Sequence, residues 1–189
     1  MKNAKIKQMV GIALMSAIVV ILQLLGQFFP IGPVSISLVL IPIVVGAAVY
    51  GPTAGAILGG VSGIVILLQP DTVWFHNISV IGTIVTVMAK GILSGWISGL
   101  AYRILAKRNE WVAVIVAAIL CPIVNTGIFA IGCRLFFWSG LTETAEASMM
   151  DTVTFLFTGM IGFNFIAEFV ANVICAPVIS RILHAAKKH

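Results

Sequence analysis

The feature that most constrains this chain is the recurrence of apolar stretches of about 20 residues along its whole length. A helix rises 1.5 Å per residue, so such a stretch crosses the roughly 30 Å hydrocarbon core of a bilayer. Only 9% of the 189 residues are charged, whereas a soluble domain carries about 25%. The sequence therefore predicts an all-α integral membrane protein that has the lipid bilayer as a partner.

Proline, glycine and polar residues divide the chain into six expected helices. Pro30-Ile-Gly-Pro33 and Gly51-Pro52 are turn signals, residues 34–37 alternate like a short extended segment, and the polar stretches 69–77 and 138–151 are interpreted as loops. The expected helices cover residues 9–29, 38–50, 53–68, 78–105, 111–137 and 152–183. Together they form one transmembrane domain, residues 1–189, built as a six-helix bundle.

Basic residues gather at one set of helix ends. In a six-helix bundle nine of them fall on one side, and Arg134 alone falls near the other. The nine are Lys2, Lys5, Lys7, Arg103, Lys107, Arg108, Arg181, Lys187 and Lys188. The positive-inside rule then places the N- and C-termini in the cytoplasm, and the scattered charges do not form the surface patch that nucleic acid requires.

The expected helix 78–105 carries a lysine near its middle. An ammonium group at that depth costs about 2.5 kcal/mol or more, so Lys90 is expected to face the protein interior and to have a partner. Small polar residues recur with it at steps of three and four, which places them on one face. This polar face consists of Thr83, Thr86, Lys90, Ser94 and Ser98. We expect the bundle to fold around it.

Polar side chains on the last two expected helices reach the same depth as Lys90. Counted from the outer ends, Lys90, Asn125 and Asn164 lie about 11 or 12 residues in, which is roughly 17 Å at 1.5 Å per residue. Glu168 and Asn172 follow Asn164 at steps of four, on one helix face. These side chains are expected to converge inside the membrane.

The convergence has two interpretations. A buried Lys90–Glu168 pair with asparagine caps would hold helices together, as intramembrane polar groups often do. Alternatively, the groups line a substrate pocket open to the outside, with Lys90 as the anchor for an anionic or carbonyl group. Polar and aromatic residues expected above that depth favour the pocket, and they are Trp74, His76, Asn77, Arg134 and Trp138.

No catalytic motif is complete. Gly60-Val-Ser62-Gly63 matches a short pattern of intramembrane serine proteases, but no histidine falls within a later span to activate the serine. There is no GxxxxGK[ST] phosphate loop and no metal-binding spacing such as HExxH. We therefore expect a protein that is not an enzyme and has no metal or cofactor of its own.

Glycines recur at a step of four along the third expected helix, at Gly51, Gly55, Gly59 and Gly63. Small residues allow a neighbouring backbone to approach closely. This glycine edge is expected to pack against the second or the sixth helix.

Several features resemble a known family, the substrate-binding S components of energy-coupling factor (ECF) vitamin transporters. Ala13 and Ala17 on the first expected helix match the Ala-x-x-x-Ala motif of that family. The stretch Leu40-Ile-Pro-Ile-Val-Val-Gly-Ala-Ala-Val-Tyr-Gly-Pro-Thr-Ala-Gly55 is similar to the junction between its second and third helices. The chain length, the six helices and the internal termini agree, so the resemblance covers essentially the whole chain.

The resemblance implies a substrate-binding subunit of an ECF-type ABC importer, a multi-pass protein of the bacterial plasma membrane. Such a subunit captures a vitamin outside the cell and delivers it to the cytoplasm. Ala13 and Ala17 would dock on the transmembrane coupling subunit, and two partner ATPase subunits would use ATP. The missing phosphate loop agrees with that division of labour.

The identity of the vitamin is inferred from side-chain chemistry. Lys90 and Arg134 suit a carboxylate, and Asn125 and Asn164 suit hydroxyl and amide groups. Among the substrates of the family, pantothenate fits best and is the leading prediction. The alternatives are riboflavin, a pyridoxine-type vitamin or a thiamin precursor, or a stand-alone secondary carrier, for which inverted repeats would be expected.

Overall fold

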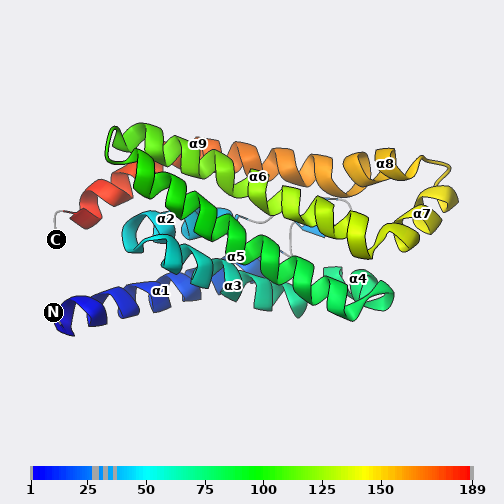
Figure 1. Ribbon diagram of the computed structural model, residues 1–189, viewed down its shortest axis with the longest axis horizontal. Helices are drawn as coiled ribbons and strands as arrows, with labels where there is room; N and C mark the ends of the chain where they lie inside the picture. Colours follow the sequence, from blue (N-terminus) through cyan, green and yellow to red (C-terminus); the bar gives the residue numbers. More distant parts are fainter. Residues whose placement is uncertain (1, 27–29, 32–33, 36–37, 188–189) are drawn as a thin grey trace.

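The computed structural model describes residues 2–26, 30–31, 34–35 and 38–187, and these residues form an elongated bundle of helices (Figure 1). The longer helices are α1 (Lys2–Gly26), α3 (Pro52–Leu67), α5 (Val80–Leu105), α6 (Glu110–Phe136) and α9 (Phe163–Lys187). The shorter ones are α2 (Leu40–Tyr50), α4 (Val73–Ile78), α7 (Trp138–Ala147) and α8 (Thr152–Phe155). A 3-10 turn, η1 (Pro70–Thr72), precedes α4, and a π-helical segment, η2 (Leu156–Gly162), precedes α9.

A two-residue antiparallel pairing precedes α2. Strand β1 (Pro30–Ile31) pairs with β2 (Val34–Ser35), with Ile31 opposite Val34. The extended segment expected at 34–37 is thus present at Val34–Ser35, and its last two residues lie outside the described part of the chain.

Short polar side chains fix several helix starts. The hydroxyl oxygen of Ser79 accepts a hydrogen bond from the backbone N–H of Gly82 at the start of α5. Asn109 caps α6, and Asp151 caps α8, in the same manner. Such caps satisfy N–H groups that have no partner within the helix. Between α2 and α3, Gly51 adopts φ 96°, a conformation that favours glycine, and Pro52 opens the next helix.

Two segments expected as loops are helical in the structure. Residues 69–77 contain η1 and most of α4, and residues 138–151 contain α7. Each segment has an apolar side that the count of polar residues concealed. Phe75 is buried on α4, and Leu141 and Ala145, four residues apart, are buried on α7. The first helix also begins at Lys2 rather than near residue 9.

Among the described residues, four helical stretches are long and apolar enough to cross a membrane: α1, α5, α6 and the combined α8–α9. A fifth candidate joins α3 to η1 and α4 through a bend of 78°. The remaining apolar helix, α2, has 11 residues. The structure confirms a predominantly helical fold with four or five candidate spans among the described residues, while the count of six spans and the side of the termini stay predictions.

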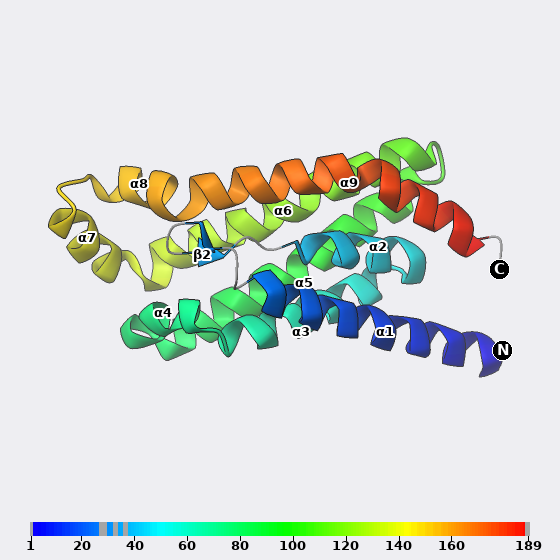
Figure 2. The same ribbon diagram turned by 180° about the vertical axis from the view of Figure 1, so that it is seen from behind.

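The short helix α2 occupies the middle of the bundle. It contacts α1, α3, α5, α6 and α9, and its residues Pro42, Ile43, Val44 and Val45 are all buried. A helix that is apolar on every side and surrounded by other helices belongs to the core. The longer helices therefore pack around α2, and the figures show them running roughly along one axis (Figures 1 and 2).

The glycine edge of α3 packs mainly on α5, which corrects the expectation that it meets the second or sixth helix. A methyl group added to Gly59 would collide with the carbonyl oxygen of Gly91, and one added to Gly55 would collide with that of Gly95. Gly55 also faces Ala47 of α2. The expectation was right for α2 at Gly55 and missed the larger contact with α5, because α5 has its own small residues at a step of four, Gly91, Gly95 and Gly99.

The start of α1 and the end of α9 lie at the same end of the bundle (Figures 1 and 2). The junction of α5 and α6, with Lys107 and Arg108, lies there too, whereas α4, α7 and α8 lie at the opposite end. Apart from Arg134 in the last turn of α6, the described basic residues at the helix ends therefore share one end of the molecule, as the charge pattern predicted.

Candidate functional site

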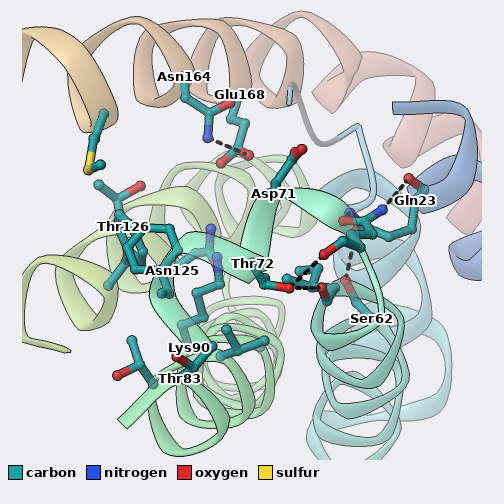
Figure 3. A pocket seen from close by; sticks show the side chains of 18 of the residues that line it. Gln23, Ser62, Asp71, Thr72, Thr83, Lys90, Asn125, Thr126, Asn164 and Glu168 are labelled. Atoms are coloured by element: carbon teal, nitrogen blue, oxygen red, sulfur yellow. Dashed lines mark hydrogen bonds between the residues drawn. The ribbon is translucent and has the colours of Figure 1, made fainter. Parts of the chain in front are cut away.

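A cavity lies between the helices in the half of the bundle away from the start of α1 and the end of α9. Figure 3 shows side chains that line it. The space open to the centres of water molecules measures about 90 Å³. A single water needs about 10–15 Å³ on this measure, so the cavity holds several waters or a small organic group. Its walls come from α1, α2, α3, α5, α6 and α9, together with η1, α4 and η2.

The side chain of Lys90 lines the cavity. It lies in the eleventh position of α5, and its Nζ is 5.0 Å from the centroid of the Phe129 ring on α6. Glu168 of α9 lines the same cavity. Lys90 makes no hydrogen bond to a described residue, so within the described part of the chain its three N–H donors are left for water or a ligand.

The α9 wall is rich in hydrogen-bond acceptors. Asn164 donates from Nδ2 to Glu168 Oε1 at 3.3 Å, and Asn172 donates to the backbone oxygen of Glu168 at 2.8 Å. The Oδ1 atom of Asn164 is buried and has no hydrogen-bond partner among the described residues. The same is true of the Thr86 hydroxyl on α5. Both residues line the cavity, so each has a polar group available to a bound molecule.

A third wall joins α1, α3 and η1. Gln23 donates from Nε2 to Gln69 Oε1 at 3.1 Å, and Gln69 donates from its own Nε2 to the backbone oxygen of Gln23 at 2.9 Å. Ser62 donates to Gln23 Oε1 at 3.1 Å. All three side chains are 5% exposed and line the cavity. Figure 3 shows Gln23 and Ser62 on the side opposite Asn125 and Thr126.

Aromatic and aliphatic side chains cover the end of the cavity near α4 and η2. Phe75 packs edge-on against Phe129 at 5.7 Å and against Phe137 at 5.1 Å. Met160 and Ile161 from η2 complete this side. A π-helical segment shifts the register of the side chains that follow it. In this chain η2 lies directly before the turn of α9 that carries Asn164.

The polar face predicted on the helix 78–105 points into the bundle. Thr83, Thr86, Ser94 and Ser98 are all buried, and Lys90 is half-buried. The first two line the cavity together with Lys90, whereas the hydroxyls of Ser94 and Ser98 donate to carbonyl oxygens of α5 itself. The face therefore divides into a cavity-lining half and a packed half.

Four predicted site residues line the cavity, and they are Lys90, Asn125, Asn164 and Glu168. The other four lie outside its lining, and they are Trp74, His76, Asn77 and Arg134. Successive helical residues turn by about 100°, and α4 points Phe75 at the cavity, so its neighbours face elsewhere. Arg134 is exposed and stacks over the Trp138 ring at 4.5 Å. A ligand-binding role for these four stays a prediction.

Sequence reasoning missed the third wall of the cavity, formed by Gln23, Ser62 and Gln69 and called the glutamine wall below. Gln23 was a visible signal, because an amide within an apolar stretch requires partners. Ser62 entered the sequence analysis only as part of a protease-like pattern. Gln69 was assigned to a loop. Only the fold shows that these positions, 39 and 46 residues from Gln23, meet it.

A multi-pass helical membrane protein with an internal cavity lined by a lysine, amides and carboxylates belongs to the class of proteins that bind small polar molecules within the membrane. The chain matches a family model described as ECF transporter, substrate-specific component, over residues 7–180. It therefore belongs to this family. Comparisons with curated proteins and with solved structures found no match. Membership implies, in general terms, a vitamin substrate and ECF coupling and ATPase partners.

Proposed function

We propose that this chain captures a small vitamin with a carboxylate group, pantothenate in the leading case, and delivers it to the cytoplasm as the S component of an ECF importer. The observation that carries the proposal is the position of Lys90. Its amine faces a cavity, and within the described part of the chain it donates to no protein acceptor. A cation in that setting gains most from an anionic ligand group, because the surrounding membrane protein excludes bulk water.

The acceptors of the opposite wall complement this choice. Glu168 and the free Oδ1 of Asn164 accept hydrogen bonds, which suits the hydroxyl and amide N–H groups of pantothenate. Riboflavin and the thiamin precursor lack a carboxylate, and so does a pyridoxine-type vitamin in its alcohol form. Those vitamins would offer Lys90 no anionic group of their own. The same reasoning favours a binding pocket over a Lys90–Glu168 pair that serves only to join helices.

We infer the orientation and the partner surface from the same helices. The end that carries Lys107, Arg108 and Arg181 faces the cytoplasm under the positive-inside rule, so the cavity lies in the outer half. Ala13 and Ala17 are exposed on α1, and small exposed residues permit close approach by another helix. We therefore assign this face to the coupling subunit.

The test compares pantothenate with pantothenol, in which an alcohol replaces the carboxylate. A ligand that binds the native state raises its apparent melting temperature by mass action. Purified wild-type protein is expected to be stabilised by pantothenate at concentrations at least about tenfold below those required for pantothenol. In Lys90→Met, which keeps an unbranched side chain, this preference should be lost.

Three outcomes are informative. Equal binding of the two compounds by wild type would refute the role of Lys90 as a carboxylate anchor. A shift with riboflavin, pyridoxine or a thiamin precursor, and none with pantothenate, would replace the lead substrate and keep the class. The absence of any shift across these vitamins would overturn the proposed function.

A further inference from the structure

The glutamine wall connects the cavity to a helix that is otherwise loosely held. Among the four long membrane-crossing candidates in the described residues, α1 is the least buried. It contacts α2 and α3 along one side. Val19 on that side is fully buried, while Leu14 and Ile21 on the other side are exposed. A peripheral helix of this kind can shift at lower cost than a helix enclosed by the bundle.

Two glutamine side chains of α1 donate hydrogen bonds to the rest of the bundle, one near each end of the helix. Gln8 donates to the backbone oxygen of Tyr50 at 3.1 Å, at an exposed site near the chain start. Gln23 bonds to Gln69, and accepts from Ser62, at the cavity. The two sites lie 15 residues apart, about 22 Å along the helix at 1.5 Å per residue. Only the second site is in contact with the cavity.

A molecule in the cavity therefore touches the attachment of α1 directly. The side chains of this wall that face the cavity hydrogen-bond to one another. A bound molecule that packs against them excludes water from these bonds, which strengthens them in the low-dielectric interior. The cavity end of α1 can be attached to the bundle or detached from it. A ligand that binds the attached state more tightly shifts the equilibrium toward that state.

We infer that the Gln23–Ser62–Gln69 cluster is a latch through which an occupied cavity holds the C-terminal half of α1 against the bundle. Gln23 is a positioning residue in this scheme. The inference rests on the proposed function, because it requires a cavity ligand. The same helix carries Ala13 and Ala17, so a latched α1 would present the proposed docking face in one fixed position.

The experiment measures amide hydrogen exchange of α1 peptides in detergent-solubilised full-length protein, with and without saturating pantothenate. In wild type, pantothenate is expected to slow exchange over residues 18–26 by about tenfold, which corresponds to about 1.4 kcal/mol. Gln23→Leu should still be stabilised by pantothenate, with Kd weakened by about tenfold, but the ligand-dependent protection of residues 18–26 should be lost.

Gln8→Leu is the matched control, because it removes a hydrogen bond of the same kind from the same helix at a site remote from the cavity. It should retain the full ligand-dependent protection of residues 18–26. Ser62→Ala removes one bond of the cluster and leaves both glutamines, so it serves if Gln23→Leu folds poorly. Its ligand-dependent protection should lie between those of wild type and Gln23→Leu.

Each alternative result has a defined meaning. Protection that persists in Gln23→Leu and Ser62→Ala, or that disappears equally in Gln8→Leu, overturns the latch while the proposed function stands. Stabilisation of wild type by pantothenate without slower exchange in α1 does the same. If wild type is stabilised by neither pantothenate nor any vitamin of the panel, the proposed function fails and the latch fails with it.

Discussion

Thr83 and Thr86 lie one turn apart on α5 and both line the cavity, yet their hydroxyl groups are used differently. The Thr83 hydroxyl donates to the backbone oxygen of Ser79 at 2.8 Å. The Thr86 hydroxyl is buried and has no hydrogen-bond partner within the described part of the chain. Such a group lowers stability unless water or a ligand satisfies it. Because Thr86 lines the cavity together with Lys90, we expect its hydroxyl group to bind the ligand.

Thr86→Val should therefore stabilise the empty protein and weaken its ligand binding. Valine has almost the same shape and needs no hydrogen bond, so the free energy of unfolding should rise by about 1 kcal/mol. Loss of a hydrogen bond to the ligand should raise Kd by roughly tenfold. Melting curves recorded with and without pantothenate give both quantities.

The control is Thr83→Val, which breaks a satisfied hydrogen bond within α5. It should leave the melting temperature of the empty protein unchanged or lower it, with little change in ligand affinity. If both valine variants behave alike, the Thr86 hydroxyl has no special role in binding.

At this scale, the sequence identified some site residues and could not identify others. Lys90 was evident because a charge within an apolar helix is costly, and the steps of three and four showed which residues share its face. Gln69 carried no such signal. Its role depends on a contact with Gln23 that spans 46 residues, and no periodicity within one helix encodes a contact between helices.

Among the elements, the α3–α5 interface depends on glycine more than any other part of the described chain. A methyl group at Gly59 would meet the backbone of Gly91, which has no side chain that can move aside. Gly127 on α6 differs, because a methyl group there would meet nothing within 4 Å. Alanine substitutions at these two positions distinguish two effects. The first is the cost of a steric clash between helices, and the second is the greater helix propensity of alanine compared with glycine.

Gly59→Ala should lower the free energy of unfolding by about 1–3 kcal/mol, since it forces two backbones apart. On the scale of roughly 2–4 °C per kcal/mol, the melting temperature should fall by several degrees. Gly127→Ala should raise stability by about 0.5–1 kcal/mol, because alanine favours helix more than glycine does. Thermal unfolding in one detergent tests both. A neutral Gly59→Ala would show that the helices have room between them.

Element prediction succeeded where apolar length alone decided the outcome and failed for short helices. The bounds of α2, α3, α5 and α6 fall within about two residues of the expected ones, which is the usual uncertainty of helix ends. The helices α4 and α7 were missed because each buries only one or two residues. They are stabilised by contacts with residues of other elements, such as Phe75 with Phe137. Such contacts cannot be predicted from the sequence of the short helix alone.

At the scale of the whole molecule, the basic and acidic residues at the helix ends are distributed along the long axis of the bundle. The described basic residues at the helix ends, except Arg134, lie at the end that holds the start of α1 and the end of α9. The acidic residues Glu143, Glu146 and Asp151 lie near the opposite end, on and after α7. The cavity lies in the half near these acids. Under the proposed function, ligand entry and partner binding use different parts of the molecule, so we expect that a substitution can disrupt one without the other.

Ala17→Trp tests this separation. Ala17 is exposed on the outer side of α1, remote from the cavity lining, so the variant should bind pantothenate as wild type does. A tryptophan there would hold an approaching helix away, at a cost of about 1–3 kcal/mol, and should reduce co-purification with the coupling and ATPase subunits by tenfold or more. Ile131→Trp on α6, at a site 60% exposed, places the same large side chain elsewhere on the surface and should leave assembly intact. If Ala17→Trp assembles normally, α1 is not the docking helix. If both tryptophan variants fail to assemble, bulk anywhere on the lipid-facing surface is harmful and the assignment of a local docking face is wrong.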